Sequence, residues 1–219
     1  MSNAIALFAK APIPGSVKTR LQSHLTAKQA AALHFAFVQD TWASLSSIES
    51  ASLYLYSDQE WPGFRKLAGP GRVGQQRGAD LGEKMLYCFE DLGQQGHHRM
   101  LIVGSDSPTL PPDYLRAGLE LLGDFDAVLG PSEDGGYYAV GCRSAKAGMF
   151  KEVSWSTAST LTETERAFER AGLTSERLPA WYDIDTIENL RRLVSEGDLP
   201  EHGRRWLHQN PDLWGELEF

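Results

Sequence analysis

The sequence is poor in cysteine and has no long apolar run. Cys88 and Cys142 are the only cysteines among 219 residues, and neither lies in a C-x-x-C pattern. A disulfide framework and a cysteine zinc site are therefore not indicated. The opening apolar run, Ala4–Ala9, has no basic region before it and is far shorter than the ~18 residues of a membrane span. We expect a cytoplasmic protein with two half-buried thiols in a reducing compartment and no membrane partner.

Positive charge is also scarce. The chain has 21 Lys and Arg against 29 Asp and Glu, a net charge of -8. This balance disfavours nucleic acid as a partner, because phosphate backbones attract basic surfaces. A single nucleotide needs only a few local cations, so nucleotide binding is compatible with the composition.

Several catalytic signatures are missing as well. The sequence contains no G-x-S-x-G, H-E-x-x-H or G-x-G-x-x-G motif, and its six histidines have no metal-ligand spacing. We interpret the histidines as surface or packing residues.

What is present is a regular alternation of strand and helix patterns. The pattern predicts strands over 4–9, 52–56, 72–76, 100–104, 127–130 and 137–141, and helices after 26, over 81–92, from 111, and over 159–171, 186–196 and 201–209. Such alternation indicates an α/β fold with a mainly parallel sheet and helices on both faces. No linker or repeat divides the chain, so we expect one domain over 1–219 with a helical extension over 190–219. Whether Trp214 packs there is left open.

Two finer expectations concern single helices. Thr26 and Gln29 form a possible capping box at the start of the first helix. Over 81–92, Leu81, Met85, Phe89 and Leu92 form one buried stripe, and Gly93 with Gly96 ends the helix.

The loop after the first strand concentrates cations in an acidic chain. Prolines stiffen it, a glycine permits close backbone approach, and the basic side chains can neutralise phosphate oxygens. The residues concerned are Lys10, Pro12, Gly15, Lys18 and Arg20. The loop lacks the G-K-[ST] ending of a Walker motif. We therefore predict phosphate binding here, against the alternative of a solvated basic loop.

A second polar loop follows the short strand near residue 75. Gln76 can hydrogen-bond a base edge, and Gly78 allows a ring to approach. The alternative is a simple turn in which Asp80 caps the next helix.

Acidic residues follow the later strands. Ser105 and Asp106 end the clearest buried strand, where a carboxylate can hold Mg²⁺ or Mn²⁺, or where the segment merely starts a turn. Asp134, Gly135 and Gly136 can place an acid toward a sugar or acceptor, and the same residues also read as a hairpin turn.

A late pair of acids completes this set. Asp183 and Asp185 alternate in an extended segment and are expected to point the same way, which is costly unless a cation relieves their repulsion. The alternative is that Asp185 or Thr186 only caps the following helix.

Six motifs in this order resemble a known family. They are Phe8–Leu21, Gln76–Met85, Gly104–Leu110, Gly130–Tyr138, Trp155–Thr157 and Asp183–Thr186. Together they resemble the bacterial GT-A-type glycosyltransferase-like family linked to arsenosugar biosynthesis and radical-SAM/selenodomain gene neighbourhoods. That family is similar to nucleotide-diphospho-sugar transferases and phospholactate guanylyltransferases.

The resemblance implies a single Rossmann-like GT-A domain with metal-dependent chemistry. It places phosphates at the first loop, the base or ribose near Gln76, Gly78 and Asp80, and the sugar or acceptor at Asp134. It implies catalytic roles for Lys18, Asp106 and Asp134, and substrate contacts that include Ser105 and Trp155. The implied metal ligands for Mg²⁺ or Mn²⁺ are Asp106, Asp183 and Asp185, although Ser105-Asp106-Ser107 supplies one acid where many glycosyltransferases have D-x-D.

Three functions follow as hypotheses. The first is transfer of a sugar from a nucleotide-diphospho-sugar to a small-molecule acceptor. The second is nucleotidyl transfer from a nucleoside triphosphate to a phosphorylated small molecule with release of pyrophosphate. The third is a non-catalytic nucleotide-binding protein.

A ligand screen tests the common element of these hypotheses. Nucleotides or nucleotide sugars with Mn²⁺ should raise the apparent melting temperature, because a ligand that binds only the native state stabilises it. At about 100 times the Kd the gain is roughly 2.7 kcal/mol. A thermal-shift series with and without Mn²⁺ measures this, and an unchanged melting temperature with every nucleotide would contradict all three.

Overall fold

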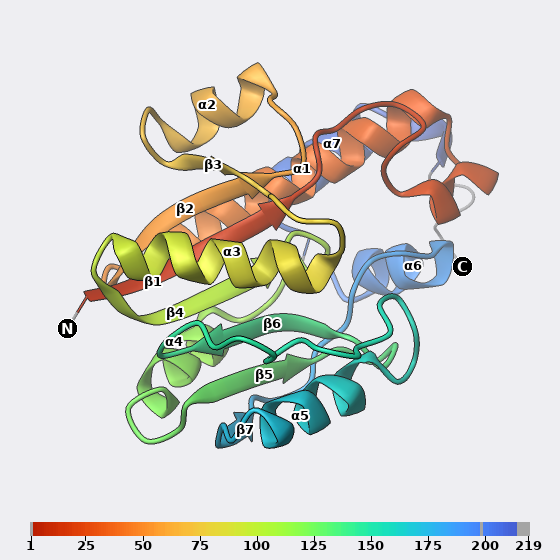
Figure 1. The fold of residues 1–219 in the computed structure, drawn as a ribbon. Helices are drawn as coiled ribbons and strands as arrows, with labels where there is room; N and C mark the ends of the chain where they lie inside the picture. The colour runs from red at the N-terminus through yellow and green to blue at the C-terminus, as the bar shows by residue number, and fades with distance from the viewer. Residues whose placement is uncertain (1, 198, 214–219) are drawn as a thin grey trace.

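A single mixed sheet organises the chain (Figure 1). The computed structural model describes residues 2–197 and 199–213. Within them, seven strands pair in the order β3-β2-β1-β4-β6-β5-β7. The strands are β1 Ser2–Ala9, β2 Ala51–Ser57, β3 Val73–Gln75, β4 His97–Gly104, β5 Ala127–Pro131, β6 Tyr137–Cys142 and β7 Ser175–Arg177.

The sheet is parallel except at β6. Strand β6 runs antiparallel to both neighbours. Its Val140 lies opposite Ile102 of β4 and Leu129 of β5. Because β5 returns to the direction of β4, the carboxyl ends of β1, β2, β3, β4, β5 and β7 all meet one edge. The predicted mainly parallel α/β sheet is confirmed, with β5 and β6 forming a hairpin inside it.

Side-chain alternation in β1 explains how both faces are covered. Ile5 and Leu7 pack on one face with residues of α1 (Ala27–Ser46), α2 (Pro62–Ala68) and α4 (Pro112–Leu121). Ala4 and Ala6 face the other way, toward α3 (Leu81–Gln94) and α5 (Thr160–Arg170). Successive strand residues point to opposite faces, so an apolar run such as β1 must be buried on both. In Figure 1, α3 crosses one face of the sheet and α1 the other.

The chain after the sheet forms a third apolar cluster against α1. Helices α6 (Ile187–Ser195) and α7 (Glu201–His208) and the short helix Pro211–Leu213 bury Leu190, Leu193 and Trp206 there. Buried Asp40 of α1 accepts hydrogen bonds from the backbone N–H groups of His202, at 2.8 Å, and Gly203, at 2.7 Å. It therefore satisfies two of the orphan donors at the start of α7. The question raised for Trp214 lies outside the described residues.

Some local expectations were wrong. Leu81, predicted on the buried stripe of its helix, is 39% exposed, whereas Met85, Phe89 and Leu92 are buried. Gly93 lies within α3 and only Gly96, with φ 87°, follows its end. Helix α2 and strand β7 had no sequence prediction, because both are short. The capping box of Thr26 and Gln29 is confirmed.

None of the described helices combines the length and the hydrophobicity that crossing a bilayer would require.

Replacement of Asp40 tests how α7 is held. In Asp40→Ala, the backbone N–H groups of His202 and Gly203 lose their acceptor, and we expect the free energy of unfolding to fall by about 1–3 kcal/mol. Asp40→Asn keeps one side-chain oxygen and should lose less. Urea denaturation monitored by tryptophan fluorescence measures both, and an unchanged midpoint for Asp40→Ala would show that these bonds do not stabilise α7.

Candidate functional site

All the predicted loops except the one that carries Asp134 border a cleft of about 550 Å³ at the carboxyl edge of the sheet. Segments after β1, β3 and β4 contribute, together with the segment near residue 185 that follows β7. Ligand sites in open α/β sheets lie beyond this edge because the loops, and not the strands, are free to vary there. The lining side chains include Phe8, Lys10, Lys18, Arg20, His34, Gln76, Leu81, Lys84, Ser105, Asp106, Ser156 and Asp185.

Lys18 lies at the centre of this site and is 8% exposed. Its ammonium contacts Asp106 Oδ1 at 2.5 Å, the Ile184 carbonyl oxygen at 2.6 Å and Asp185 Oδ1 at 3.0 Å. Those three acceptors match the three protons of an ammonium group. Burial by itself would lower the pKa of Lys18, but the charges of Asp106 and Asp185 keep it above its usual value. Lys18 is therefore a buried cation that joins three separate segments.

The backbone of Lys18 is held in an unusual conformation. Its φ of 47° and ψ of 41° lie in the left-handed region, which costs a non-glycine residue roughly 1–3 kcal/mol. Such a conformation persists only when surrounding contacts impose it. The three bonds of the ammonium group supply those contacts.

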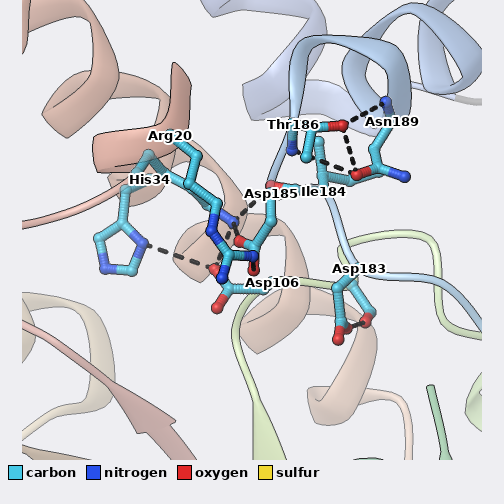
Figure 2. Close-up of polar contacts among 10 residues, drawn as sticks. Arg20, His34, Asp106, Asp183, Ile184, Asp185, Thr186 and Asn189 are labelled. Atoms are coloured by element: carbon cyan, nitrogen blue, oxygen red, sulfur yellow. Dashed lines mark hydrogen bonds and ion pairs between the residues drawn. The ribbon is translucent and has the colours of Figure 1, made fainter. Parts of the chain in front are cut away.

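The Asp106 carboxylate lies next to Lys18 and His34 (Figure 2). Its carboxylate is 43% exposed and pairs with Lys18, and His34 Nδ1 lies 4.0 Å from Oδ1. Partial withdrawal from water opposes ionisation of Asp106, yet the charge of the Lys18 ammonium holds its pKa below the usual range. The carboxylate is therefore ionised near neutral pH.

His34 is buried and was not predicted as a site residue. Its Nε2 lies 2.9 Å from the Lys10 carbonyl oxygen, and because a carbonyl only accepts, Nε2 carries the proton. Burial lowers the pKa of His34, against the attraction of Asp106. Burial therefore favours the neutral ring, whose Nδ1 lies 4.0 Å from Asp106 Oδ1. No sequence spacing identifies it, because its neighbours in the site come from β4 and the first loop.

Asp183 and Asp185 have different partners. Asp185 pairs with Lys18, and its other oxygen lies 4.0 Å from the Arg20 guanidinium. Asp183 accepts a short hydrogen bond from Ser107 Oγ. Thr186, not Asp185, caps α6 through a capping box with Asn189. Neither acid caps α6, so both carboxylates remain available to the site.

Asp183 is the least compensated acid of the group. Burial raises its pKa to about 6, the charges of Asp106, Asp134 and Asp185 add to the rise, and the Ser107 hydrogen bond opposes it. Like charges in a partly dry site favour the neutral acid. A cation added near Asp183 would remove this cost.

The hairpin between β5 and β6 explains its glycines structurally. Asp134 Oδ1 accepts hydrogen bonds from Ser132 Oγ at 2.5 Å and from Gly136 N at 2.9 Å. Gly135 has φ 90°, and a Cβ there would lie 2.3 Å from the Ala158 carbonyl oxygen. The turn interpretation is therefore confirmed. Asp134 is exposed and does not line the cleft, although its charge reaches Asp183.

The loop after β3 contains one residue that lines the cleft and one that only caps a helix. Gln76 lines the cleft, and its Nε2 donates to the Tyr56 carbonyl oxygen at 2.9 Å. Asp80 caps α3 by accepting from Glu83 N at 2.8 Å, as the alternative interpretation has it. Gly78, with φ 127°, has no room for a Cβ, which would lie 2.6 Å from Glu83 Cβ.

The cleft collects fewer than half of the predicted residues. Those that line it are Lys10, Lys18, Arg20, Gln76, Ser105, Asp106 and Asp185. Those that do not are Pro12, Gly15, Gly78, Asp80, Asp134, Gly135, Gly136, Trp155 and Asp183. Trp155 packs against Phe150 with ring centroids 6.1 Å apart, and its neighbour Ser156 lines the cleft. The binding roles of all the predicted residues, inside and outside the cleft, stay predictions.

Lys84, like His34, is an ionisable lining residue that sequence reasoning missed. It lies one turn after Leu81 in α3, and its ammonium makes no ion pair within the described ranges. The motif Gly82-Glu83-Lys84 was visible in the sequence, but a lysine on an amphipathic helix is usually solvated surface.

Removal of the Lys18 charge should destabilise the protein in a pH-dependent way. Lys18→Met leaves two carboxylates without their shared cation, and we expect a loss of about 1–3 kcal/mol at pH 7, moderated because both carboxylates are partly exposed. The folded-state pKa of Lys18 is raised, so its contribution persists until the pH climbs through that pKa. The folded-state pKa of Asp106 is lowered, so its contribution is lost as the pH falls through that pKa.

Urea denaturation of the wild type and Lys18→Met between pH 3 and pH 8 measures this difference. The difference in unfolding free energy between the wild type and Lys18→Met should be steady from about pH 6 to 8 and shrink below about pH 4. Lys28→Met removes an exposed lysine of α1 and is the matched control. If the difference in unfolding free energy grew in acid, the two carboxylates left without their shared cation would not be its cause.

Comparison with known proteins places the chain in a family. A bacterial family described as "Uncharacterized protein conserved in bacteria (DUF2064)" matches residues 41–157. A protein of Desulfovibrio desulfuricans G20 described as a "putative nucleotide-diphospho-sugar transferase" is 31% identical, with 99% of each chain covered and a TM-score of 0.88. No curated protein matches the chain.

More distant solved structures share the fold. The inositol-1-phosphate CTP transferase of T. maritima is 15% identical with a TM-score of 0.55, covering 94% of this chain and 96% of its own. CMP:2-keto-3-deoxy-manno-octonic acid synthetase complexed with CTP is 11% identical with a TM-score of 0.52, covering 90% and 100%. The single α/β domain therefore has the nucleotidyltransferase and GT-A type of fold, and the chain belongs to the DUF2064 family.

Proposed function

We propose that this protein transfers a sugar from a nucleotide-diphospho-sugar to a small-molecule acceptor. One observation carries the proposal: in a chain of net charge -8, basic residues gather around the cleft at the carboxyl edge of the sheet. In the described parts of the chain, Lys10 and Lys84 form no ion pair, and Arg20 makes only the 4.0 Å contact with Asp185. Cations held without partners favour an anionic ligand such as a diphosphate.

The named relative supports the same class of donor. The protein of Desulfovibrio desulfuricans G20 carries the description "putative nucleotide-diphospho-sugar transferase" and aligns over 99% of this chain. The finer resemblance to the arsenosugar-linked family agrees with this proposal and stays an expectation.

The reaction would break the bond between the sugar anomeric carbon and the diphosphate oxygen. The electron pair leaves with the nucleoside diphosphate, and an acceptor hydroxyl forms the new bond and gives up its proton. Lys10 and Arg20 would neutralise the charge that grows on the leaving diphosphate. Asp134 is the proposed group that orients or deprotonates the acceptor, because its Oδ1 is fixed by Ser132 and Gly136 while it remains exposed.

We propose that the acids of the site hold a divalent cation together with the substrate. No three His, Cys, Asp or Glu side chains of residues 2–197 and 199–213 form a complete metal cage. Mg²⁺ is usually held by one or two carboxylates together with substrate phosphates and water, so a complete cage is not needed. The uncompensated Asp183 and the partly exposed Asp106 are the proposed ligands for Mg²⁺ or Mn²⁺, and Asp185 would join them if it left Lys18. The bound ion would supply Lewis-acid stabilisation of the diphosphate.

Nucleotidyl transfer is the second candidate. Lys10, Arg20 and Lys84 provide three cations at one cleft, a set that suits a triphosphate as well as a diphosphate. The fold relatives that use CTP belong to this class. A non-catalytic nucleotide-binding role is the third, and it would leave the acids of the site without a use.

Substitution of Asp106 tests the catalytic proposal. With Mg²⁺ or Mn²⁺ present, the wild type should release a nucleoside diphosphate from a nucleotide sugar, and Asp106→Ala should reduce that rate by about 100-fold or more. Release of pyrophosphate from nucleoside triphosphates would instead favour the second candidate. Nucleotide products are measured by chromatography and pyrophosphate by a coupled assay.

Two controls make the result interpretable. Asp124→Ala removes an exposed acid away from the cleft and should keep full activity. Circular dichroism should show that Asp106→Ala still folds. Full activity in Asp106→Ala would refute its role, and tight nucleotide binding without turnover would leave the binding protein as the explanation.

A further inference from the structure

The cleft has basic side chains on two opposite sides. Lys10 and Arg20 belong to the first loop and to the short helix Thr19–Ser23, which packs on α1 at one face of the sheet. Lys84 belongs to α3, which covers the other face (Figure 1). Across residues 2–197 and 199–213, the Lys84 ammonium has no carboxylate within ion-pair distance. The cleft therefore presents unpaired positive charge to a ligand from two directions.

Ser156 also lines the cleft, and its backbone is strained. Its φ of 61° lies in the left-handed region, which is costly for a residue other than glycine. Ser156 is exposed, and neither its hydroxyl nor its backbone N–H has a hydrogen-bond partner in the described parts of the chain. Strain of this kind persists where neighbouring contacts impose it, and it is common at ligand sites.

The residues on both sides of Ser156 impose this conformation. A Cβ on Gly82 would lie 2.7 Å from the Trp155 ring, so Trp155 packs directly against the start of α3. The backbone N–H of Thr157 donates to Thr160 Oγ1 at 3.2 Å, which ties it to the start of α5. Ser156 is therefore fixed beside the helix that carries the unpaired lysine.

The segment that carries Ser156 also contacts the hairpin that carries Asp134. A Cβ on Gly135 would lie 2.3 Å from the Ala158 carbonyl oxygen, so the hairpin turn and this segment are in direct contact. Asp134 is the acid proposed above to face the acceptor, whereas the donor diphosphate is assigned to the first loop. Lys84 and Ser156 therefore lie toward the acceptor side of the cleft.

We propose that Lys84 and Ser156 bind an anionic group of the acceptor, so that the acceptor is a hydroxyl compound that also carries a carboxylate or a phosphate. This inference rests on the proposed sugar transfer. The Lys84 ammonium supplies the opposite charge, and the hydroxyl and backbone N–H of Ser156 can each donate to an oxyanion. An acceptor held by its anion has its hydroxyl oriented toward the donor sugar.

Calorimetry with pyrophosphate already bound tests this assignment. Pyrophosphate stands in for the donor diphosphate, and glycerol 3-phosphate, glycerate and glycerol are then titrated as probes that share hydroxyl groups and differ in charge. We expect at least one anionic probe to bind and glycerol not to bind, and the stronger anionic probe tells phosphate from carboxylate. In Lys84→Met the Kd of that probe should rise about tenfold or more, the value of a charge-assisted hydrogen bond.

Ser156→Gly separates binding from folding. Glycine adopts the left-handed conformation without strain, so the melting temperature should not fall, whereas loss of the hydroxyl should raise the Kd of the anionic probe about fivefold. Lys66→Met removes an exposed lysine of α2 away from the cleft and is the matched control for Lys84→Met. If circular dichroism shows that Lys84→Met folds poorly, Lys84→Gln removes the same charge.

The remaining outcomes separate this inference from the proposed function. If Lys84→Met weakened pyrophosphate binding as much as binding of the anionic probe, Lys84 would belong to the donor side, as nucleotidyl transfer requires, and the inference would be wrong. If pyrophosphate bound but neither anionic probe did, or if glycerol bound as tightly as the anionic probes, the inference would be wrong while the proposed function stood. If neither pyrophosphate nor any nucleotide bound, the proposed function would fail and this inference with it.

Discussion

The site depends on one buried ammonium group. Lys18 follows the first strand, yet its three hydrogen bonds end on Asp106 after β4 and on Ile184 and Asp185 near the end of the chain. These segments are about 90 and 165 residues away in sequence, and the left-handed backbone of Lys18 shows that the contacts impose its conformation. Because an unpaired ammonium is costly in a dry environment, loop, strand end and C-terminal segment must come together as one unit.

This arrangement separates the cations of the site into two groups. Lys18 is saturated by protein acceptors and stabilises the acids, so it has no free proton to offer a phosphate in this state. Among residues 2–197 and 199–213, Lys10 and Lys84 have no ion-pair partner, and Arg20 is 66% exposed and makes only a 4.0 Å contact with Asp185. Phosphate binding therefore falls to residues at the rim, while the buried lysine holds Asp106 and Asp185 in position. A phosphate or metal that drew the Asp185 side chain away would have to compete with its hydrogen bond from Lys18.

Charge repulsion within the site disfavours the ionised form of Asp183. The pKa of Asp183 is raised to about 6 although Ser107 donates to it, because Asp106, Asp134 and Asp185 all lie within electrostatic reach. Perturbed acids are common in functional clefts, where the missing compensation comes from the ligand.

The sequence by itself determined the strands other than β7, most helix starts and the edge of the sheet that carries the chemistry. These features follow from local periodicity and from capping residues such as Thr26, Asp80 and Thr186, which act over three or four residues. The family motifs added the likeness to nucleotide-dependent transferases. Only the tertiary structure decided which charges are free. It paired Lys18 with two acids, placed buried His34 beside Asp106, and used Gly135 and Asp80 for a turn and a cap. Those outcomes depend on distances between segments far apart in the chain, and residue type alone does not encode such distances.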